Sequence, residues 1–455
     1  MHPRPPAVSA RLHTAVDPRP RPRPRLWREA TEALRQRRGV IRVETLLPDA
    51  VEPLAWLAAQ DGSEKAFWHG RDDGSCRAAL GAADVIEGED LFARLDEAAR
   101  ALPDGARYLG GLRFDDSMAP EAEWAGFGSG RFVLPRVELV ARGDRTVLAL
   151  NAVASRDTPA DLRAALDALT FDAPPLATRL DFPVARLDRP DRERWDEAIA
   201  SALAAMERGD VQKVVLARRA TYRFEEGLDP AALLARLTIA APEAFHVLLS
   251  DGEGRTFVAA TPERLVRVEG RRAWTEAVAG TRRKGEGAGA LAFRDELAGS
   301  EKDRREHAFV RDFISEALAP LASLVAVEAP RQIEAGRVRH LKTPLRAHLR
   351  GDVTPLAAMN ALHPTPAVGG TPTPEALAAI RDLEGFDRGL YAGPVGWVGR
   401  DGAEFAVGIR SGLVCGTDLA LYAGAGIVPG SEAEAEWQET EAKLGAFADA
   451  LGLDA

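Results

Sequence analysis

The stretch Tyr422-Ala-Gly-Ala-Gly-Ile-Val-Pro-Gly-Ser-Glu-Ala-Glu-Ala-Glu-Trp-Gln-Glu-Thr-Glu-Ala-Lys443 joins a short apolar strand to a charged helix through a glycine-rich turn. Ser431 is followed three residues later by a glutamate, which is the spacing of a capping box, so we expect the helix to begin there. Within this helix Glu436, Glu439 and Lys443 share one face, because they are three and seven residues apart. The pattern predicts either a functional loop and helix or a solvated charged helix, and the rest of the chain is needed to decide.

The composition is that of a soluble globular protein. The chain has 455 residues, of which 46% are hydrophobic and 28% are charged, and this length allows a large buried core. Cys76 and Cys415 are far apart and in no metal-like spacing, so nothing in the sequence indicates a zinc site or a disulfide framework. The net charge of −10 argues against a nucleic-acid partner. No apolar run is long enough for a membrane span or a signal peptide, so we expect a cytoplasmic protein.

The chain divides into three regions by sequence pattern. Residues 1–26 are rich in arginine and proline and are expected to be a disordered leader. Residues 27–184 contain short strand patterns, such as the alternating residues 40–45 and 145–150, and offer no catalytic cluster. Residues 185–453 alternate helix and strand patterns and hold the candidate site residues. No Gly/Ser-rich linker separates the second and third regions, so we predict one large domain.

A lysine occurs inside an apolar strand pattern. The sequence Val-Gln-Lys-Val-Val-Leu-Ala-Arg at residues 211–218 predicts a strand in which Lys213 lies on the same face as Val211 and Val215. Burial of a charged ammonium group is unfavourable because desolvation favours the neutral amine. Lys213 is therefore either on an edge strand, where its amine reaches water, or a buried base or anion ligand.

A glutamate follows a Thr-Pro bend between two strand patterns. Glu263 comes directly after Pro262, at the point where one apolar run ends and the next begins. This position predicts a carboxyl group whose protonation is set by its protein neighbours. The alternative is a surface ion pair with Arg264 or Arg267.

A second acidic helix is predicted after residue 300. Ser300-Glu-Lys-Asp303 is a helix-start signal, and the pattern continues to about residue 318. Glu306 lies on the apolar face of this helix, together with Phe309, Val310, Phe313 and Ala317. A carboxylate there needs a cation nearby. Together with Glu436 and Glu439 it gives oxygen ligands on two helices, the arrangement that Mg²⁺ prefers.

Three further segments carry candidate binding groups. Residues 277–281 read Ala-Val-Ala-Gly-Thr and predict a small-residue turn whose Gly280 and Thr281 can donate to an anion. Residues 362–370 form a Pro/Gly-rich loop ahead of a predicted helix. Arg410 ends an apolar run, a position suited to bidentate binding of a carboxylate. The glycines of the opening stretch are not a dinucleotide fingerprint, because the third glycine and the following strand are missing.

These motifs occur in the order found in the chorismate-utilising enzymes, and the chain is similar to that family over about residues 190–450. The resemblance rests on Lys-Val-Val-Leu-Ala-Arg, Thr-Pro-Glu-Arg-Leu, Ala-Gly-Thr, Ser-Glu-Lys-Asp-Arg-Arg-Glu-His, His340-Leu, His-Pro-Thr-Pro-Ala-Val, Arg410-Ser and the opening stretch. The loop that begins at His363 resembles that of isochorismate synthases. Anthranilate and aminodeoxychorismate synthases carry a different loop there. Thr261 stands where the family usually has serine.

The resemblance implies an α+β fold: a single large chorismate-binding domain of layered antiparallel β-sheets flanked by helices. It also implies an isomerase that converts chorismate to isochorismate with Mg²⁺, Lys213 being the base that activates water and Glu263 the acid that protonates the departing hydroxyl. By the same resemblance Glu306 and Glu439 bind the metal, with Glu436 acting through a water. The expected substrate contacts come from Gly280, Thr281, Ala367, Arg410, Gly424, Gly426 and Lys443.

Three alternatives remain open from the sequence. A salicylate synthase would also eliminate pyruvate, and an amine-inserting synthase would need ammonia and a glutaminase partner. A silent chorismate-binding subunit is disfavoured because the base, the acid and the metal ligands occur together. We expect a monomer without a glutaminase subunit. The sequence does not choose between menaquinone, siderophore and salicylate synthesis as the use of the product.

Overall fold

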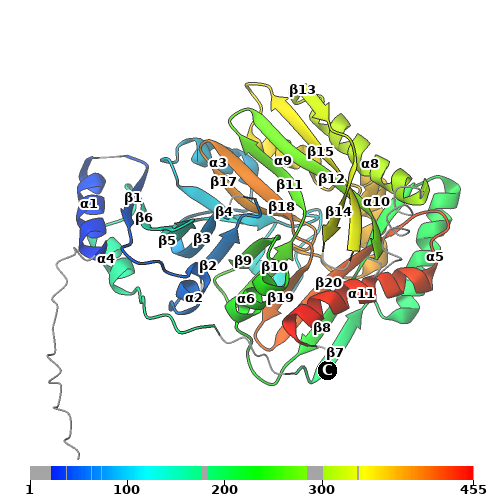
Figure 1. Cartoon of the computed structure of the whole chain (residues 1–455), viewed down its shortest axis with the longest axis horizontal. Helices are drawn as coiled ribbons and strands as arrows, with labels where there is room; N and C mark the ends of the chain where they lie inside the picture. Colours follow the sequence, from blue (N-terminus) through cyan, green and yellow to red (C-terminus); the bar gives the residue numbers. More distant parts are fainter. Residues whose placement is uncertain are drawn as a thin grey trace, which may run out of the picture.

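The computed structural model describes the backbone of residues 22–36, 38–62, 64–72, 74–176, 182–283, 301–335 and 338–453. Residues 1–21 of the predicted leader and Ser300 lie outside these described residues. Every strand pairing in the described part is antiparallel, and the strands form one branched sheet with helices on its outer faces (Figure 1). The predicted α+β class and the single layered domain are confirmed.

The first branch of the sheet carries the lysine strand. Its strands pair in the order β7 (Ala185–Arg189), β8 (Lys213–Arg223), β20 (Asp418–Ile427), β19 (Ser411–Cys415), β10 (Arg255–Thr261), β9 (Phe245–Ser250), β2 (Lys65–His69), β3 (Cys76–Glu87), β5 (Gly130–Arg142), β6 (Arg145–Val153) and β1 (Val40–Leu46). The two-residue strand β16 (Gly370–Thr371) pairs with the start of β8. Strands from both halves of the sequence therefore lie in one branch, and the two groups meet where β9 pairs with β2.

The second branch starts at β5, a strand that belongs to both branches and joins them. Its strands pair in the order β5, β4 (Arg107–Leu112), β17 (Pro394–Gly399), β18 (Gly402–Val407), β11 (Arg264–Glu269), β12 (Arg272–Arg283) and β15 (Val338–Leu349), and β15 then pairs with β13 (Ala322–Val327) and β14 (Arg331–Ala335). Buried side chains of both branches, such as Val214, Phe257 and Phe405, belong to one hydrophobic core. The inner faces of the two branches thus enclose the centre of the molecule.

Helices cover the outer faces in groups. Around β8 and β20 lie α5 (Arg192–Arg208), α10 (Thr373–Glu384) and α11 (Ala433–Leu451), and around β11 and β12 lie α8 (Glu301–Leu318) and α9 (Pro355–Leu362). The remaining helices are α1 (Pro22–Gln36), α2 (Pro53–Ala58), α3 (Leu91–Arg100), the 3₁₀ helix η1 (Ala122–Phe127), α4 (Pro159–Asp167) and α6 (Pro230–Ala240). No helix in the described ranges is long and apolar enough to cross a membrane.

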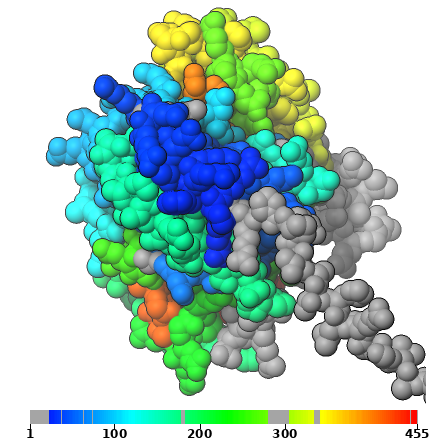
Figure 2. All heavy atoms as spheres, turned by 90° about the vertical axis from the view of Figure 1, so that its left-hand side faces the viewer, coloured from blue at the N-terminus to red at the C-terminus, as the bar shows by residue number. Residues whose placement is uncertain are grey.

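Residues 22–26 correct the predicted leader, because they form the first turn of α1. Leu26 is fully buried at 0% exposure, and the Arg23 guanidinium donates a hydrogen bond to the carbonyl oxygen of Leu169 at 2.6 Å. The Trp27 indole donates to the carbonyl oxygen of Pro159 at 2.9 Å. Figure 2 shows α1 lying across the surface at this end of the molecule, where it packs on α4 and β1. An apolar face that docks on the sheet overrides the low-complexity pattern.

Two local predictions from the sequence are wrong. Helix α11 begins at Ala433 without a side-chain cap, because the Ser431 hydroxyl donates instead to Glu436 Oε1 at 2.7 Å. The small-residue segment 277–281 is not a turn but part of β12. The register between β12 and β15 shifts between Ala279 and Thr281, so Gly280 is the additional residue of a β-bulge.

The chain passes between the two branches twice at the same place. Strand β10 of the first branch continues into β11 of the second through Pro262 and Glu263, and β18 of the second continues into β19 of the first through residues 408–410. The Ala260 amide donates to the carbonyl oxygen of Arg410, and the Val407 amide donates to that of Glu263, both at 3.0 Å. We call these two connections the corner. It brings Glu263 and Arg410 side by side.

The close approach of Gly389 to the fully buried Trp124 gives a stability test. Gly389 has φ +54°, and a Cβ atom there would lie 1.9 Å from the indole. Gly389→Ala should therefore lower the free energy of unfolding by about 3 kcal/mol, from the left-handed backbone and from overpacking. Gly270→Ala is the control, because Gly270 has φ +58° with nothing within 4 Å; it should lose only about 1 kcal/mol. Urea unfolding measures both, and equal losses would contradict the packing argument.

Candidate active site

Lys213 is buried at the start of a central strand. It is 1% exposed, and β8 pairs with β20 on one side and with β7 and β16 on the other, so the edge-strand alternative is wrong. Its ammonium group donates a hydrogen bond to Glu306 Oε1 at 2.8 Å. The candidate base and one candidate metal ligand are therefore in direct contact. The opposite charge of Glu306 is what makes burial of the lysine tolerable.

The position of β8 is fixed by the Pro/Gly loop and by a buried ion pair between Glu384, the last residue of α10, and Arg388 in the segment that follows. The Gln212 amide donates to the carbonyl oxygen of Thr371 at 2.8 Å, and the Val215 amide donates to that of Gly369 at 2.7 Å. The Arg388 guanidinium pairs with Glu384 and donates to the carbonyl oxygen of Val215 at 2.8 Å. The loop whose sequence resembles that of isochorismate synthases thus fixes the position of Lys213 in the site.

The corner presents an acid and a cation that have no other polar partner. Among the described residues, neither the Glu263 carboxyl nor the Arg410 guanidinium makes a hydrogen bond or ion pair, and both side chains are half-buried. Thr261 holds the bend, because its hydroxyl donates to the carbonyl oxygen of Val407 at 2.7 Å and accepts from the Glu263 amide at 3.3 Å. The predicted surface pairing of Glu263 with Arg264 or Arg267 is wrong, since these arginines bind Glu404 and Glu269.

The electrostatics of the corner keep Glu263 protonated at neutral pH. Burial raises the pKa of Glu263 to about 8, and the negative charge of Glu276 adds to the rise. The positive charges of Lys213, Arg410 and Arg71 oppose it. Burial likewise lowers the pKa of Arg410. A carboxyl that holds its proton near pH 7 is suited to act as a general acid.

The glycines of the opening stretch allow close contact with these groups. A Cβ atom on Gly426 would lie 3.1 Å from Glu306 Oε1 and 3.1 Å from Lys213 Cε, and one on Gly424 would lie 3.1 Å from the Tyr391 hydroxyl. Lys443 reaches the same strand from α11, because its ammonium donates to the carbonyl oxygen of Gly424 at 2.8 Å. The C-terminal end of β20 therefore lines the candidate site.

The three candidate metal ligands approach this strand but are occupied by other groups. Glu306 accepts from Lys213, Glu439 from Lys443 at 2.8 Å, and Glu436, which is buried, from Ser431. In the described part of the chain no three His, Cys, Asp or Glu side chains form a group that could hold a metal ion. The donor chemistry fits a hard divalent cation. Such an ion would compete with the two lysines for Glu306 and Glu439.

For three of the predicted substrate contacts, Gly280, Thr281 and Ala367, the structure gives the backbone position and little more. Gly280 and Thr281 lie at the bulge of β12, and the Thr281 side chain lies outside the described part of the structure. Ala367 lies in the loop that pairs with β8, where its amide donates to the Thr365 hydroxyl at 3.3 Å. The sequence missed Tyr391, which borders Gly424 and stacks on Tyr422 with 5.2 Å between ring centroids. It also missed Arg71 and Glu276, whose long-range contacts leave no local pattern.

Comparisons with known proteins agree with this geometry. The family model described as "Chorismate binding enzyme" matches residues 28–452. The chain belongs to the chorismate-binding enzyme family. Among curated members, it is 33% identical to the salicylate biosynthesis isochorismate synthase of Pseudomonas aeruginosa over 89% of this chain and 90% of that protein. It is 34% identical to isochorismate synthase 2 of Arabidopsis thaliana over 76% of this chain, but spans only 64% of that longer plant protein.

A solved structure of the same family supports the fold. The menaquinone-specific isochorismate synthase MenF from Escherichia coli superposes with a TM-score of 0.84 and 27% sequence identity. The superposition covers 95% of this chain and 99% of that chain. The two sheet branches and the corner of this chorismate-binding enzyme therefore lie within a shared architecture.

The raised pKa of Glu263 predicts a pH-dependent stability. A carboxyl whose pKa is higher in the folded than in the unfolded protein contributes fully below its unfolded value, about 4.3, and the contribution is lost as pH rises through about 8. From pH 5 to pH 9 the wild type should lose at least about 1 kcal/mol more unfolding free energy than Glu263→Gln, which cannot ionise. Urea unfolding without substrate or added divalent cation measures this. Glu269→Gln should behave as the wild type, and parallel losses in all three proteins would refute the shifted pKa.

Proposed function

We propose that this protein is an isochorismate synthase, which converts chorismate to isochorismate by adding water at C2 with loss of the C4 hydroxyl. One observation carries the proposal: the buried Lys213 and the protonated Glu263 belong to one site, because Lys213 acts on the pKa of Glu263. The same site contains Arg410, whose guanidinium makes no hydrogen bond or ion pair with the described residues. The similarity to curated isochorismate synthases over most of the chain supports the same reaction.

The proposed chemistry divides two proton transfers between the two sheet branches. Lys213, at the start of β8, takes a proton from the water that attacks C2, and for this step its amine must be in the neutral form, having given up the proton that it shares with Glu306. Glu263, at the corner, gives its proton to the hydroxyl that leaves C4, so that water is consumed and released in equal amounts. Each such acid or base typically contributes about 10²–10⁴-fold to the rate. The proton that Glu263 holds at neutral pH is the one this step requires.

Substrate binding is assigned to the positive groups of the site. Chorismate carries two carboxylates, and a chain with net charge −10 needs local cations to hold them. Arg410, whose guanidinium makes no hydrogen bond or ion pair with the described residues, is proposed to bind the enolpyruvyl carboxylate. Lys443 contributes a second cation, and the backbone at Gly424, Gly426, Gly280, Thr281 and Ala367 supplies the close contacts.

Magnesium is proposed as the cofactor. Glu306 and Glu439 would hold the ion, with Glu436 acting through a bound water. When bound, Mg²⁺ supplies positive charge that stabilises the ring carboxylate of the substrate. The other groups of the chain retain the roles given above.

The two other reactions of the family are distinguishable by their products. A salicylate synthase would release pyruvate, and the similarity of the His363 loop to isochorismate synthases argues against it. An amine-inserting enzyme would give an aminated product with ammonium. We further propose a cytoplasmic monomer that needs no glutaminase subunit. The product serves menaquinone, siderophore or salicylate synthesis, and a chromatographic assay with chorismate and Mg²⁺ tests the reaction itself.

The acid and the base should be separable from substrate binding. Lys213→Ala and Glu263→Gln should each lower kcat by at least about 100-fold while the Kd for chorismate changes less than about threefold. Arg410→Met should show the opposite pattern, with weaker binding as the main effect. Turnover is measured by product chromatography and binding by calorimetry. A matching loss of affinity in both the lysine and the glutamate variants would contradict their roles in proton transfer.

The metal proposal predicts loss of activity with EDTA and its return with Mg²⁺. Glu306→Ala and Glu439→Ala should each weaken Mg²⁺ binding, measured by calorimetry without chorismate, and should abolish turnover. Glu434→Ala is the matched control on α11, because Glu434 faces away and pairs with Arg192. Full turnover of the EDTA-treated wild type would eliminate the two-helix carboxylate site.

A further inference from the structure

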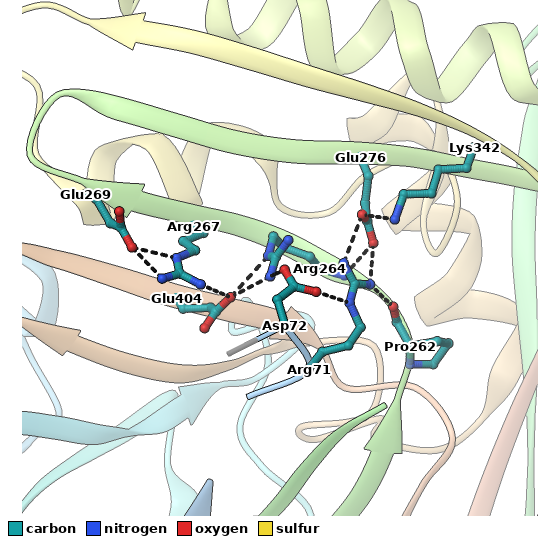
Figure 3. A network of polar contacts seen from close by, with 9 residues as sticks. All are labelled: Arg71, Asp72, Pro262, Arg264, Arg267, Glu269, Glu276, Lys342 and Glu404. Atoms are coloured by element: carbon teal, nitrogen blue, oxygen red, sulfur yellow. Dashed lines mark hydrogen bonds and ion pairs between the residues drawn. The ribbon is translucent and has the colours of Figure 1, made fainter. Parts of the chain in front are cut away.

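A cluster of charged side chains lies beside the backbone on either side of Glu263. Arg71, in the loop after β2, forms a bidentate ion pair with Glu276 on β12, with N–O distances of 2.7 and 3.1 Å. Lys342 on β15 also pairs with Glu276. Figure 3 shows these three side chains meeting above Pro262, at the bend that leads to Glu263. We call Arg71, Glu276 and Lys342 the triad.

The triad is bonded to the backbone on both sides of Glu263. The Arg71 guanidinium donates a hydrogen bond to the carbonyl oxygen of Pro262, the residue before it. Glu276 Oε1 accepts from the amide of Arg264, the residue after it, at 3.4 Å. The two members of this ion pair therefore bind the two peptide groups that flank Glu263, Arg71 the one before it and Glu276 the one after it. These peptide groups define the direction of the Glu263 side chain.

Each member of the triad is mostly buried, Lys342 with a side chain that is 13% exposed, and this burial restricts its motion. Glu276 is 6% exposed and the Arg71 side chain is 13% exposed. The Arg71 guanidinium also lies over the Phe245 ring, 5.1 Å from its centroid. A bidentate arginine pair supported by an aromatic ring has little rotational freedom. An error of about 1 Å in the place of a catalytic group can cost about 100-fold in rate.

We propose that Arg71 and Glu276 are positioning residues for the general acid Glu263, so that the N-terminal half of the chain, through Arg71, helps to orient a catalytic group. This inference rests on the proposed function of Glu263. It assigns a role to a region in which the sequence shows no catalytic cluster. It also gives Arg71 two separate effects: it orients the bend through Pro262, and its charge acts on the carboxyl group.

Charged groups on four segments act on the pKa of Glu263, and Tyr391, on a fifth, also interacts with it electrostatically. The two positioning residues have opposite effects on this pKa. Glu276 on β12 raises the pKa of Glu263, after burial, which is the larger cause. Lys213 on β8, Arg410 at the corner and Arg71 after β2 lower it. An acid is active while protonated, so the alkaline limb of the pH profile of kcat/KM follows the pKa of Glu263. A purely structural role for the triad would not move this limb in opposite directions.

The experiment compares variants of the full-length protein with saturating Mg²⁺. Arg71→Met should lower kcat about 10- to 100-fold with KM for chorismate within about threefold, and should move the alkaline limb to higher pH. Glu276→Gln should also lower kcat, but should move the limb to lower pH. Arg71→Lys keeps the charge without the forked geometry, so it should lower kcat and leave the limb near its wild-type position.

The control is Glu269→Gln, which removes a carboxylate from the exposed end of the same network, where Glu269 pairs with Arg267 (Figure 3). It should leave kcat and the limb unchanged. Limbs that do not move, or that move in the same direction in Arg71→Met and Glu276→Gln, would overturn the inference. If Arg71→Met does not fold, the pair Arg71→Lys and Glu276→Gln decides. An active Glu263→Gln would instead overturn the proposed acid itself, so the two failures are distinguishable.

Discussion

Four strands meet at the corner through a small set of backbone hydrogen bonds, and the site depends on them. The Ala260 amide bonds to the carbonyl of Arg410, and the Val407 amide bonds to that of Glu263. Because successive residues of a strand face opposite sides, the loss or gain of one residue in either connection would turn Glu263 or Arg410 away from the core. The two sheet branches are thereby kept in one register relative to each other.

The non-glycine residue in the left-handed region at this corner is Arg410, with φ +47°. Such a conformation is unfavourable for a side chain with a Cβ atom, and it is often found where the surrounding structure holds a functional residue. Here the carbonyl of Arg410 is fixed by Ala260, and the residue after it, Ser411, donates its hydroxyl to the carbonyl of Gly408 at 2.7 Å. The hydrogen bonds that join the two branches thus also hold Arg410 in this unfavourable backbone conformation.

Local patterns in the sequence were sufficient where the deciding contacts are close along the chain. The helix pattern that begins after residue 300 and continues to about residue 318 is α8, and the bend at Pro262 separates β10 from β11 as predicted. The ten-residue helix α3 and the long strand β3 did not stand out in the pattern. The burial of Lys213 could not be decided locally either, because it depends on β20 and on Glu306, both distant in sequence.

The candidate site was likewise predictable from local motifs and not predictable where contacts join distant residues. Motif order identified the family and most of the groups that the structure brings to β8, β20 and the corner. It could not show that Glu306 pairs with Lys213, that Ser431 serves Glu436 rather than the helix backbone, or that Arg71 reaches Glu276. Each of these contacts is a choice between competing partners, which only three-dimensional packing decides.

Pairing between strands that are distant in sequence also determines how the chain reaches its native state. Strand β2 pairs with β9, β4 pairs with β17, and β8 pairs with β20, so much of the sheet closes between segments that are far apart in sequence. Such non-local pairing makes folding slow, because loop closure precedes the stabilising contacts. During synthesis, β8 and β9 emerge before β20, and until β20 arrives β8 has an open edge that can template association with other chains. This topology therefore favours association of fragments that end before β20.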